Sequence, residues 1–342
     1  MDRTLLVVVV ICAFAFSFDF LNGFHDAANS VATVVSTRVL TPLQAVAWAA
    51  FFNFVAAFSL GTGVANTIGH GMIKSEFVTP DVLLAALLGA IVWDLATWWA
   101  GLPTSSSHAI IGGLAGSAIA RAQHLHGLGA SFSPIEAKGW VWTLAFIVLA
   151  PLIGMLLSGT GMTLVYWLFR KETPASSDKL FRRLQLASAA ALSWAHGTND
   201  AQKTMGVITG LLVSVKYLPS FRVPLWVILF AHLAMGLGTL AGGWRIIHTV
   251  GKRLTKLKPR TGFCAEGGAA ASILLATFLK LPVSTTHATA GAIAGVGAVQ
   301  RVKAVRWGVA SNIVWAWILT IPAAAFCAWL FEQAVRLVRG GA

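Results

Sequence analysis

The chain reads PTSSSH at residues 103–108 and PVSTTH at residues 282–287, with one copy in each half. Each copy follows an apolar stretch and precedes a stretch rich in Gly and Ala, so we expect a helix that begins at the proline and carries hydroxyl groups in its first turn. The free N–H groups and the positive dipole end of such a turn attract negative charge, and the hydroxyls add hydrogen-bond donors. The repeated pattern therefore predicts an anion-binding site.

The composition indicates a helical membrane protein. Of the 342 residues, 57% are hydrophobic and 11% are charged, and apolar runs of about 20 residues, enough to span a bilayer, recur throughout the chain. The first run, 5–18, continues into polar residues without a convincing small-residue cleavage site, so we interpret it as a membrane helix and not as a secretion signal. The sequence predicts an all-α polytopic protein surrounded by the lipid bilayer.

The charged residues and cysteines do not indicate other classes of function. The net charge is +13, but the basic residues are scattered over short loops between apolar runs, so we expect no nucleic-acid partner. The three cysteines are odd in number and lie in apolar surroundings, which predicts neither a disulfide framework nor a metal site. We expect no resident metal, no cofactor and no catalytic residue.

An internal repeat covers nearly the whole chain. The segment GFHDAAN at 23–29 matches GTNDAQK at 197–203 at an offset of 174 residues, and the two proline motifs match at an offset of 179. Because the two motifs occur in the same order in each half, they predict two membrane repeats. The expected boundaries are 1–169 and 184–342, joined by a polar cytoplasmic linker at 170–183.

The basic residues predict how the repeats are oriented. We expect each half to contain a long broken span with the Asp motif, a second span, a re-entrant or short helical hairpin that ends in the proline motif, and a third span. Three crossings in each half invert the second copy, and they place 14 basic residues on the side of the linker against eight on the other side. The richer side is expected to be cytoplasmic, with both termini outside. Two inverted-topology repeats with broken helices are the usual construction of secondary transporters.

The sequence does not decide whether the hairpin arms are half-depth helices or complete membrane spans. They run over about 82–120 and 262–299, with a proline near the middle of each, so each arm approaches the length of a full span. We favour half-depth hairpins, because non-helical backbone deep in a bilayer is tolerated only where it lines a polar cavity.

Two carboxylates, Asp26 and Asp200, occupy matched positions inside apolar segments. A carboxylate at membrane depth costs about 2.5–3.5 kcal/mol, so it normally pairs with a cation or lines a wet pathway. Together with Asn29 and Asn199, the two carboxylates are predicted to bind a coupling cation. The alternative is that they only cap broken helices, a position where Asp is favoured.

Lys203 breaks the match between the halves, because it stands where the first half has Asn29. It is a candidate to pair with Asp200 or Asp26, or to help neutralise a bound anion. The alternative is a lysine whose ammonium group extends to the membrane interface.

Four histidines accompany these motifs. His25 and His196 flank the carboxylates, and His108 and His287 end the proline motifs. An imidazole titrates near neutral pH, so each is a candidate for a proton relay. A hydrogen-bonded core histidine explains each of them equally well.

Four motifs resemble those of the PiT family of inorganic phosphate transporters: GFHDAANSVAT (23–33), LPTSSSHAIIGG (102–113), AHGTNDAQKTMG (195–206) and LPVSTTHATAGA (281–292). They include all four signature regions of that family and span both halves. The resemblance implies secondary uptake of inorganic phosphate through an inverted-repeat fold in a bacterial inner membrane, commonly as a homodimer. The family also includes sulfate permeases, so sulfate stays an alternative substrate.

The Asp motifs differ from those of the sodium-coupled branch of the same family. That branch usually has an Asn-Asp-x-x-Asn core in both halves, whereas this chain has HDAAN at 25–29 and NDAQK at 199–203. The pattern looks more like the bacterial low-affinity branch, for which the resemblance implies proton coupling and transport of phosphate with a divalent metal such as Mg²⁺. Sodium coupling is kept as the alternative.

The sequence therefore predicts a phosphate symporter in which hydroxyl groups of the two proline motifs, with their backbone amides, hold phosphate near the midplane while Asp26 and Asp200 carry the coupling cation. The hydroxyls belong to Thr104, Ser105, Ser106, Ser107, Ser284, Thr285 and Thr286. An integral-membrane phosphatase is a remote alternative, because it needs an Arg or Lys clamp and none follows His108 or His287. A passive anion channel is opposed by the two fixed negative charges.

Overall fold

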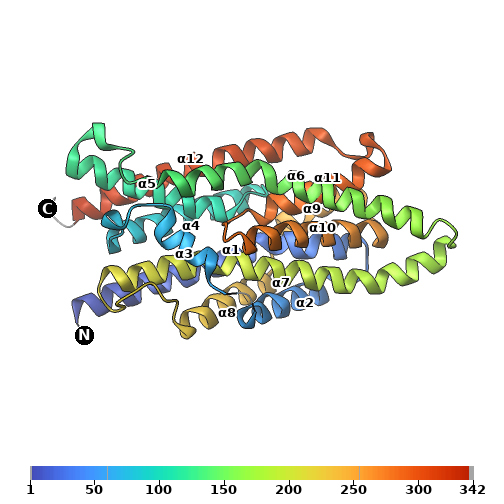
Figure 1. Cartoon of the computed structure of the whole chain (residues 1–342), viewed down its shortest axis with the longest axis horizontal. Coiled ribbons are helices and arrows are strands. Elements are labelled where there is room, and N and C mark those ends of the chain that lie inside the picture. The colour runs from blue at the N-terminus through green and yellow to red at the C-terminus, as the bar shows by residue number, and fades with distance from the viewer. Residues whose placement is uncertain (1, 60, 254, 339–342) are drawn as a thin grey trace.

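The computed structural model describes residues 2–59, 61–253 and 255–338, and within these ranges the chain forms twelve α-helices and four short 3₁₀-helices. The longer helices lie along one axis as an elongated bundle (Figure 1). The first half contains α1 (Arg3–Ser36), α2 (Pro42–Val55), η1 (Ala56–Phe58), α3 (Gly63–Gly71), η2 (Ser75–Phe77), α4 (Pro80–Ala100), α5 (Ser106–His126), η3 (Leu128–Ala130) and α6 (Ala137–Leu168). The second half contains α7 (Pro174–Ser214), α8 (Leu225–Ala241), α9 (Trp244–Arg253), α10 (Pro259–Phe278), α11 (Thr285–Gln300), η4 (Val302–Ala304) and α12 (Trp307–Val338).

The helices have the length and surface of a membrane protein. Among the described residues, α1, α4, α6, α10 and α12 are long and apolar enough to cross a bilayer, and the pair made by α2–η1 and α3, bent by 80°, is a sixth candidate. Large apolar side chains lie on the outside of the bundle; Leu156 on α6 and Phe326 on α12 are 68% and 61% exposed. Backbone groups of helices are satisfied internally, as a lipid environment requires. The expected polytopic helical class is confirmed.

The two halves repeat one order of elements, and their first helices run in opposite directions. Midway along α1, the carboxylate of Asp19 accepts a hydrogen bond from Thr204 in the last third of α7 (2.7 Å), whereas at the end of α1 Thr37 donates to Gln185 in the first third of α7 (2.9 Å). Figure 1 shows the same opposition, with both termini at one end of the bundle and the α6–α7 connection at the other.

The Asp motifs lie on unbroken helices, so the expectation of a break at these motifs was wrong. Helix α1 continues for 34 residues through Asp26, and α7 continues for 41 residues through Asp200. Their glycines allow close packing instead: a Cβ on Gly23 would lie 2.1 Å from the backbone of Met235, and one on Gly197 would lie 2.7 Å from the backbone of Asn53. In the first half the break falls in the following candidate span, between α2–η1 and α3, and at the corresponding place in the second half α8 and α9 are separate helices.

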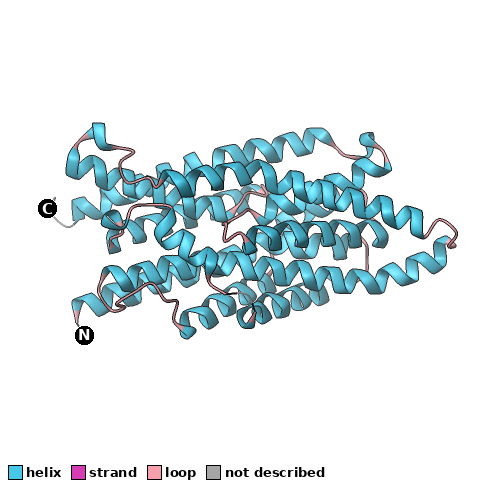
Figure 2. Ribbon diagram, in the orientation of Figure 1, coloured by secondary structure: helices cyan, strands magenta, loops and turns pink. Residues whose placement is uncertain are grey.

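The hairpins α4–α5 and α10–α11 approach from opposite ends and meet tip to tip. The Ser107 hydroxyl at the first tip donates to the Val283 carbonyl at the second (3.0 Å), and Figure 2 shows both turns as loops in the middle of the bundle. Helices α4, α5 and α10 have 20 or 21 residues, about 30 Å at the usual helical rise, so their arms are longer than the half-depth arms that we favoured.

Each hairpin packs on the long last helix of the other half. On α5, a Cβ at Gly116 would lie 1.9 Å from the Ala325 carbonyl of α12, and on α11 a Cβ at Gly295 would lie 2.3 Å from the Met155 carbonyl of α6. Only glycine permits these backbones to approach so closely. The Gly- and Ala-rich stretches of the sequence are therefore the surfaces through which the halves interlock.

The polar segment between the halves is mostly helical. Thr173 caps α7 by accepting from the backbone N–H of Ser176 (3.3 Å), and Pro174 occupies the first turn. The residues at 170–183, which we expected to be a linker, are therefore largely the first turns of α7, and only a short connection separates this helix from α6.

Candidate functional site

The hydroxyl-rich turns of the two hairpins form helix caps. The Ser105 side chain accepts a hydrogen bond from the backbone N–H of His108 at 3.2 Å, and Ser284 accepts from His287 at the same distance. Helices α5 and α11 consequently begin three residues after the prolines and not at them, as we had expected. A serine oxygen satisfies a free N–H group of the first turn, which a proline ring cannot do.

The carboxylates of Asp26 and Asp200 meet at the hairpin tips. The Nε2 atom of His196 lies 3.4 Å from Asp200 Oδ2 and 4.0 Å from Asp26 Oδ2. The Thr285 hydroxyl lies between the same oxygens, at 3.5 Å from Asp26 Oδ2 and 3.3 Å from Asp200 Oδ2. All four side chains are buried. The antiparallel helices α1 and α7 thus bring the two matched carboxylates to one point.

This centre has the chemistry of a cation site as well. Asp26, His196 and Asp200 each offer one ligand atom, and these atoms lie within 4.8 Å of one another. Two carboxylates with one imidazole are a donor set that suits a divalent metal or, with added oxygen ligands, a smaller hard cation.

Four of the seven predicted hydroxyl residues lie at the centre. Ser106 contacts Asn22 Oδ1 (2.6 Å) and Asp26 Oδ2 (3.1 Å), and Thr286 lies 3.5 Å from Asp26 Oδ1. Ser107 and Thr285 complete the set. The other three, Thr104, Ser105 and Ser284, have different partners: the two serines cap their helices, and Thr104 donates to Thr97 at 2.9 Å.

Lys203 places a fixed positive charge at the hairpin tips. Its ammonium group lies 2.6 Å from Asp200 Oδ1, donates to the Ser107 hydroxyl, and donates to the Val283 carbonyl at 3.2 Å. The side chain is 0% exposed, so the alternative of a lysine that extends to the interface was wrong. An ammonium group held by both tips can take part in anion binding.

The two matched asparagines have different surroundings. Asn29 lies at the centre and donates to the hydroxyl of Thr286 at 2.9 Å. Asn199 braces the second hairpin: it donates to Thr277 at 2.9 Å and accepts from the backbone N–H of Val283 at 3.3 Å. Of the two, Asn29 is the one whose side chain lies beside the hydroxyl pair of the second tip.

The histidines next to the carboxylates belong to hydrogen-bonded chains. His25 Nδ1 lies 3.0 Å from Asp26 Oδ1, and its Nε2 lies 3.2 Å from the Thr97 hydroxyl. His196 Nδ1 lies 3.1 Å from Asn53 Oδ1. Both imidazoles are buried, and each connects a carboxylate of the centre to polar groups on another helix.

The histidines that end the proline motifs form a separate cluster behind the tips. The rings of His108 and His287 meet edge to face at 4.6 Å, and His287 stacks on Trp317 at 3.7 Å. Among the described residues no hydrogen bond joins either histidine to Asp26 or Asp200. Their geometry is that of packed core residues.

Another buried carboxylate, that of Glu266, lies on the side of the α6–α7 connection. Glu266 is 0% exposed, and its carboxylate accepts from Thr33 (2.6 Å), Gln185 (2.8 Å) and Ser188. Thr37 donates to Gln185 in turn (2.9 Å). The signal in the sequence was the spacing of the partners, because Thr33 and Thr37, and likewise Gln185 and Ser188, share one face of a helix.

A helical bundle with an apolar outer surface and a buried centre of hydroxyls, carboxylates and one ammonium group defines an integral membrane transporter. The profile of the "Phosphate transporter family" matches residues 22–328. The chain therefore belongs to the phosphate transporter family, which confirms the PiT resemblance and excludes an enzyme.

Relatives cover nearly the full chain. A "Probable low-affinity inorganic phosphate transporter" of Rhizobium meliloti (strain 1021) is 53% identical over 341 residues, covering 99% of this chain and 100% of the relative. A protein of the same description from Bacillus subtilis (strain 168) is 44% identical, covering 95% of this chain and 96% of the relative.

A solved structure has the same fold. The chain is similar to "The sodium-dependent phosphate transporter" with a TM-score of 0.86 and 23% sequence identity, over 97% of this chain and 100% of the other. This similarity establishes the arrangement of helices.

Proposed function

We propose that the chain is a secondary active symporter that imports inorganic phosphate, bound between the two hairpin tips by Ser106, Ser107, Thr285 and Thr286. The observation that carries the proposal is the position of Lys203, whose ammonium group contacts both tips. Hydroxyl donors and a fixed cation in a buried site favour an oxyanion. The relatives from Rhizobium meliloti and Bacillus subtilis, both described as probable low-affinity inorganic phosphate transporters, support the same substrate.

The carboxylates favour phosphate over sulfate. Phosphate keeps a hydrogen at neutral pH that Asp26 or Asp200 accepts, whereas fully ionised sulfate has none to donate. A site built around a substrate hydroxyl rejects an analogue that lacks it, because a buried acceptor would remain unpaired. The same centre therefore supports phosphate as the substrate better than it supports sulfate.

We propose that protons drive the uptake. Lys203 already supplies one positive charge beside Asp200, in a place where a coupling cation would otherwise be needed. The pair His25 and Asp26, and His196 beside Asp200, provide groups that exchange protons within the centre. Mg²⁺ is then carried with phosphate as substrate. Sodium coupling is the second candidate, favoured by the cluster of Asp26, His196 and Asp200.

For the architecture we propose two inverted-topology repeats, 1–169 and 184–342, with 170–183 on the cytoplasmic side, both termini outside and the chain in a bacterial inner membrane as a homodimer. The antiparallel contacts of α1 with α7 and the exchanged hairpins support the inversion. Access alternates as one set of helices rocks against the other around the tips.

Uptake of radiolabelled phosphate into proteoliposomes tests these proposals. An imposed proton gradient should drive uptake, with stimulation by Mg²⁺ and little inhibition by excess sulfate. Dependence on a sodium gradient would overturn the coupling ion, and competition by sulfate would overturn the substrate. The absence of uptake under every gradient would overturn the symporter.

A further inference from the structure

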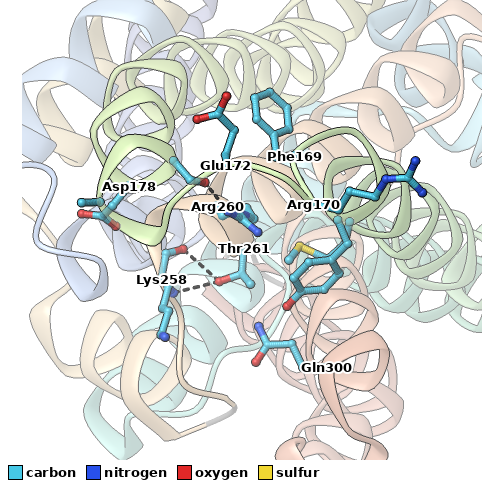
Figure 3. A pocket seen from close by; sticks show the side chains of 12 residues that line it. Phe169, Arg170, Glu172, Asp178, Lys258, Arg260, Thr261 and Gln300 are labelled. Atoms are coloured by element: carbon cyan, nitrogen blue, oxygen red, sulfur yellow. Dashed lines mark hydrogen bonds between the residues drawn. The ribbon is translucent and has the colours of Figure 1, made fainter.

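A cavity of about 850 Å³ opens at the end of the bundle where α6 connects to α7. Figure 3 shows its lining, with Arg260 and Thr261 in the middle and Lys258 and Gln300 below them. The size is that of a small-molecule site. The transport centre at the hairpin tips does not include any of these residues.

The guanidinium group of Arg260 is fixed in this cavity. Its Cζ atom lies 5.7 Å from the ring of Tyr166 and 5.5 Å from the ring of Phe181, and one of its N–H groups donates to the Ser177 hydroxyl. In the described part of the chain no carboxylate forms an ion pair with it. Aromatic faces hold an arginine without neutralising it, so the cavity contains a positioned positive charge.

The other charges of the lining leave an excess of positive charge. Lys258 and Arg170 add two cations, whereas Glu172 and Asp178 are the acids. The Asp178 carboxylate is already engaged, because Arg182 on the same helix donates to it at 3.2 Å. The balance therefore favours an anion.

The amide of Gln300 is an uncharged donor that lines the cavity, together with the first turns of α7 and α10. The Thr261 hydroxyl is already engaged, because it donates to the Lys258 carbonyl at 2.9 Å. The N-terminal end of a helix carries a partial positive charge that favours anions. Two such ends next to an unneutralised guanidinium group add to the positive potential of the cavity.

We propose that this cavity binds a phosphate group, with Arg260 as its main ligand. A guanidinium group donates two parallel hydrogen bonds to phosphate oxygens, and its remaining N–H groups keep the contact with Ser177. Two sources supply this chemistry: inorganic phosphate on the side of the α6–α7 connection, or the headgroup of an anionic lipid of the adjacent leaflet. The first source rests on the proposed transport function, and the second does not.

The full chain in nanodiscs tests the proposal with two arms and no ion gradient. The first arm measures the stoichiometry of radiolabelled inorganic phosphate bound in phosphatidylcholine discs. The second measures, by native mass spectrometry, the phosphatidylglycerol that stays bound after delipidation. The variants are Arg260→Gln and, as matched control, Arg183→Gln, which removes a nearby exposed arginine that does not line the cavity.

Arg260→Gln should reduce the amount of ligand bound in one arm about tenfold or more, as expected for lost hydrogen bonds to a charged group, while Arg183→Gln leaves the binding in both arms unchanged. Loss in the first arm identifies inorganic phosphate, and loss in the second identifies the lipid. If Arg260→Gln fails to fold, Arg260→Lys keeps the charge without the paired donors and should give the same loss. Binding that is independent of Arg260 in both arms overturns the proposal. Failure of the wild-type chain to transport phosphate would overturn the proposed function and leave the lipid arm intact.

Discussion

The two ends of the bundle differ in what lies between the centre and the outside. Towards the α6–α7 connection the interior is polar, with Glu266 and Gln185 in one hydrogen-bonded cluster. At the other end, the matched positions are Leu87 and Ile11, which belong to one buried apolar cluster. The helices are repeated in the two halves, but the interior is polar on one side of the centre and apolar on the other, where the cluster around Leu87 and Ile11 is called the apolar seal below.

A second difference between the halves lies at the centre itself. Asn29 and Lys203 occupy matched positions, but only Lys203 carries a charge, and it contacts both hairpin tips. A symmetric pair of carboxylates is therefore surrounded asymmetrically. Substitutions that give one half the residue of the other test whether these differences matter.

The largest effect is expected for Lys203→Asn, which gives the second half the residue of the first. It removes the ammonium group from the tips and leaves Asp200 without its cation, a change that costs about 3–5 kcal/mol for a buried pair. Phosphate uptake into proteoliposomes should fall at least about 100-fold.

A double variant separates folding from function in this case. Lys203→Asn combined with Asp200→Asn removes the unpaired charge, so it should restore thermal stability in detergent without restoring uptake. A tenfold change in rate corresponds to about 1.4 kcal/mol in the activation free energy. If the uptake rate of Lys203→Asn lay within about threefold of wild type, the effect would be smaller than that, and the ammonium group would be dispensable.

Leu87→Glu places in the apolar seal the residue type that the matched position of the second half, Glu266, has on the α6–α7 side. The carboxylate would find no cluster of donors there, so we expect a loss of about 3 kcal/mol in stability, measured by thermal unfolding in detergent. Leu87→Met is the control, since it conserves volume and should cost less than about 1.5 kcal/mol. An unfolding temperature for Leu87→Glu equal to that of the control would contradict the seal.

The glycines that interlock the halves should behave alike, because here the two halves use one device. Gly116→Ala and Gly295→Ala each place a Cβ within 2.3 Å of a backbone carbonyl, and each should destabilise the protein by about 1–3 kcal/mol. Gly267 on α10 has open space around its Cβ position, so Gly267→Ala should instead stabilise by about 0.5–1 kcal/mol. Thermal unfolding of the three variants measures these changes in stability. Unequal losses for Gly116→Ala and Gly295→Ala would contradict the claim that the two halves interlock in the same way.

The smallest effect is expected for Glu266→Gln, which keeps the size of the side chain and part of its hydrogen bonding. It removes the negative charge on the polar side of the centre, and we expect uptake to fall about tenfold with little change in stability. Glu76→Gln, at an exposed position, is the control. Unchanged uptake would mean that the Glu266 cluster serves only to hold helices together.

Much of the arrangement could be predicted from the repeated motifs. The matched carboxylates and the matched hydroxyl turns pointed to one polar centre, and Asp26, Asp200, Ser106 and Thr285 lie together in the structure. The predicted breaks at the Asp motifs were wrong, because Gly23 lies inside a continuous helix and serves a close contact with α8.

The partners of individual polar residues could not be predicted. The carbonyl of Val283, which holds Lys203, lies 80 residues further along the chain, and a hydrophobicity pattern does not show which pairs of distant residues meet. Glu266 was similarly ambiguous, since a lone acid in an apolar segment is as consistent with a boundary as with a buried cluster. Only the hairpin geometry decides between these positions.

The exchanged packing of the hairpins has a consequence for how the protein is made. The glycine face of α5 is covered by α12, so it stays without its partner until the chain has been synthesised beyond Ala325. Contacts between residues so distant in sequence form late, and the intermediate exposes surface that invites wrong pairing. Fragments divided between α6 and α7 should therefore be degraded when expressed alone and accumulate only when both are produced in the same membrane.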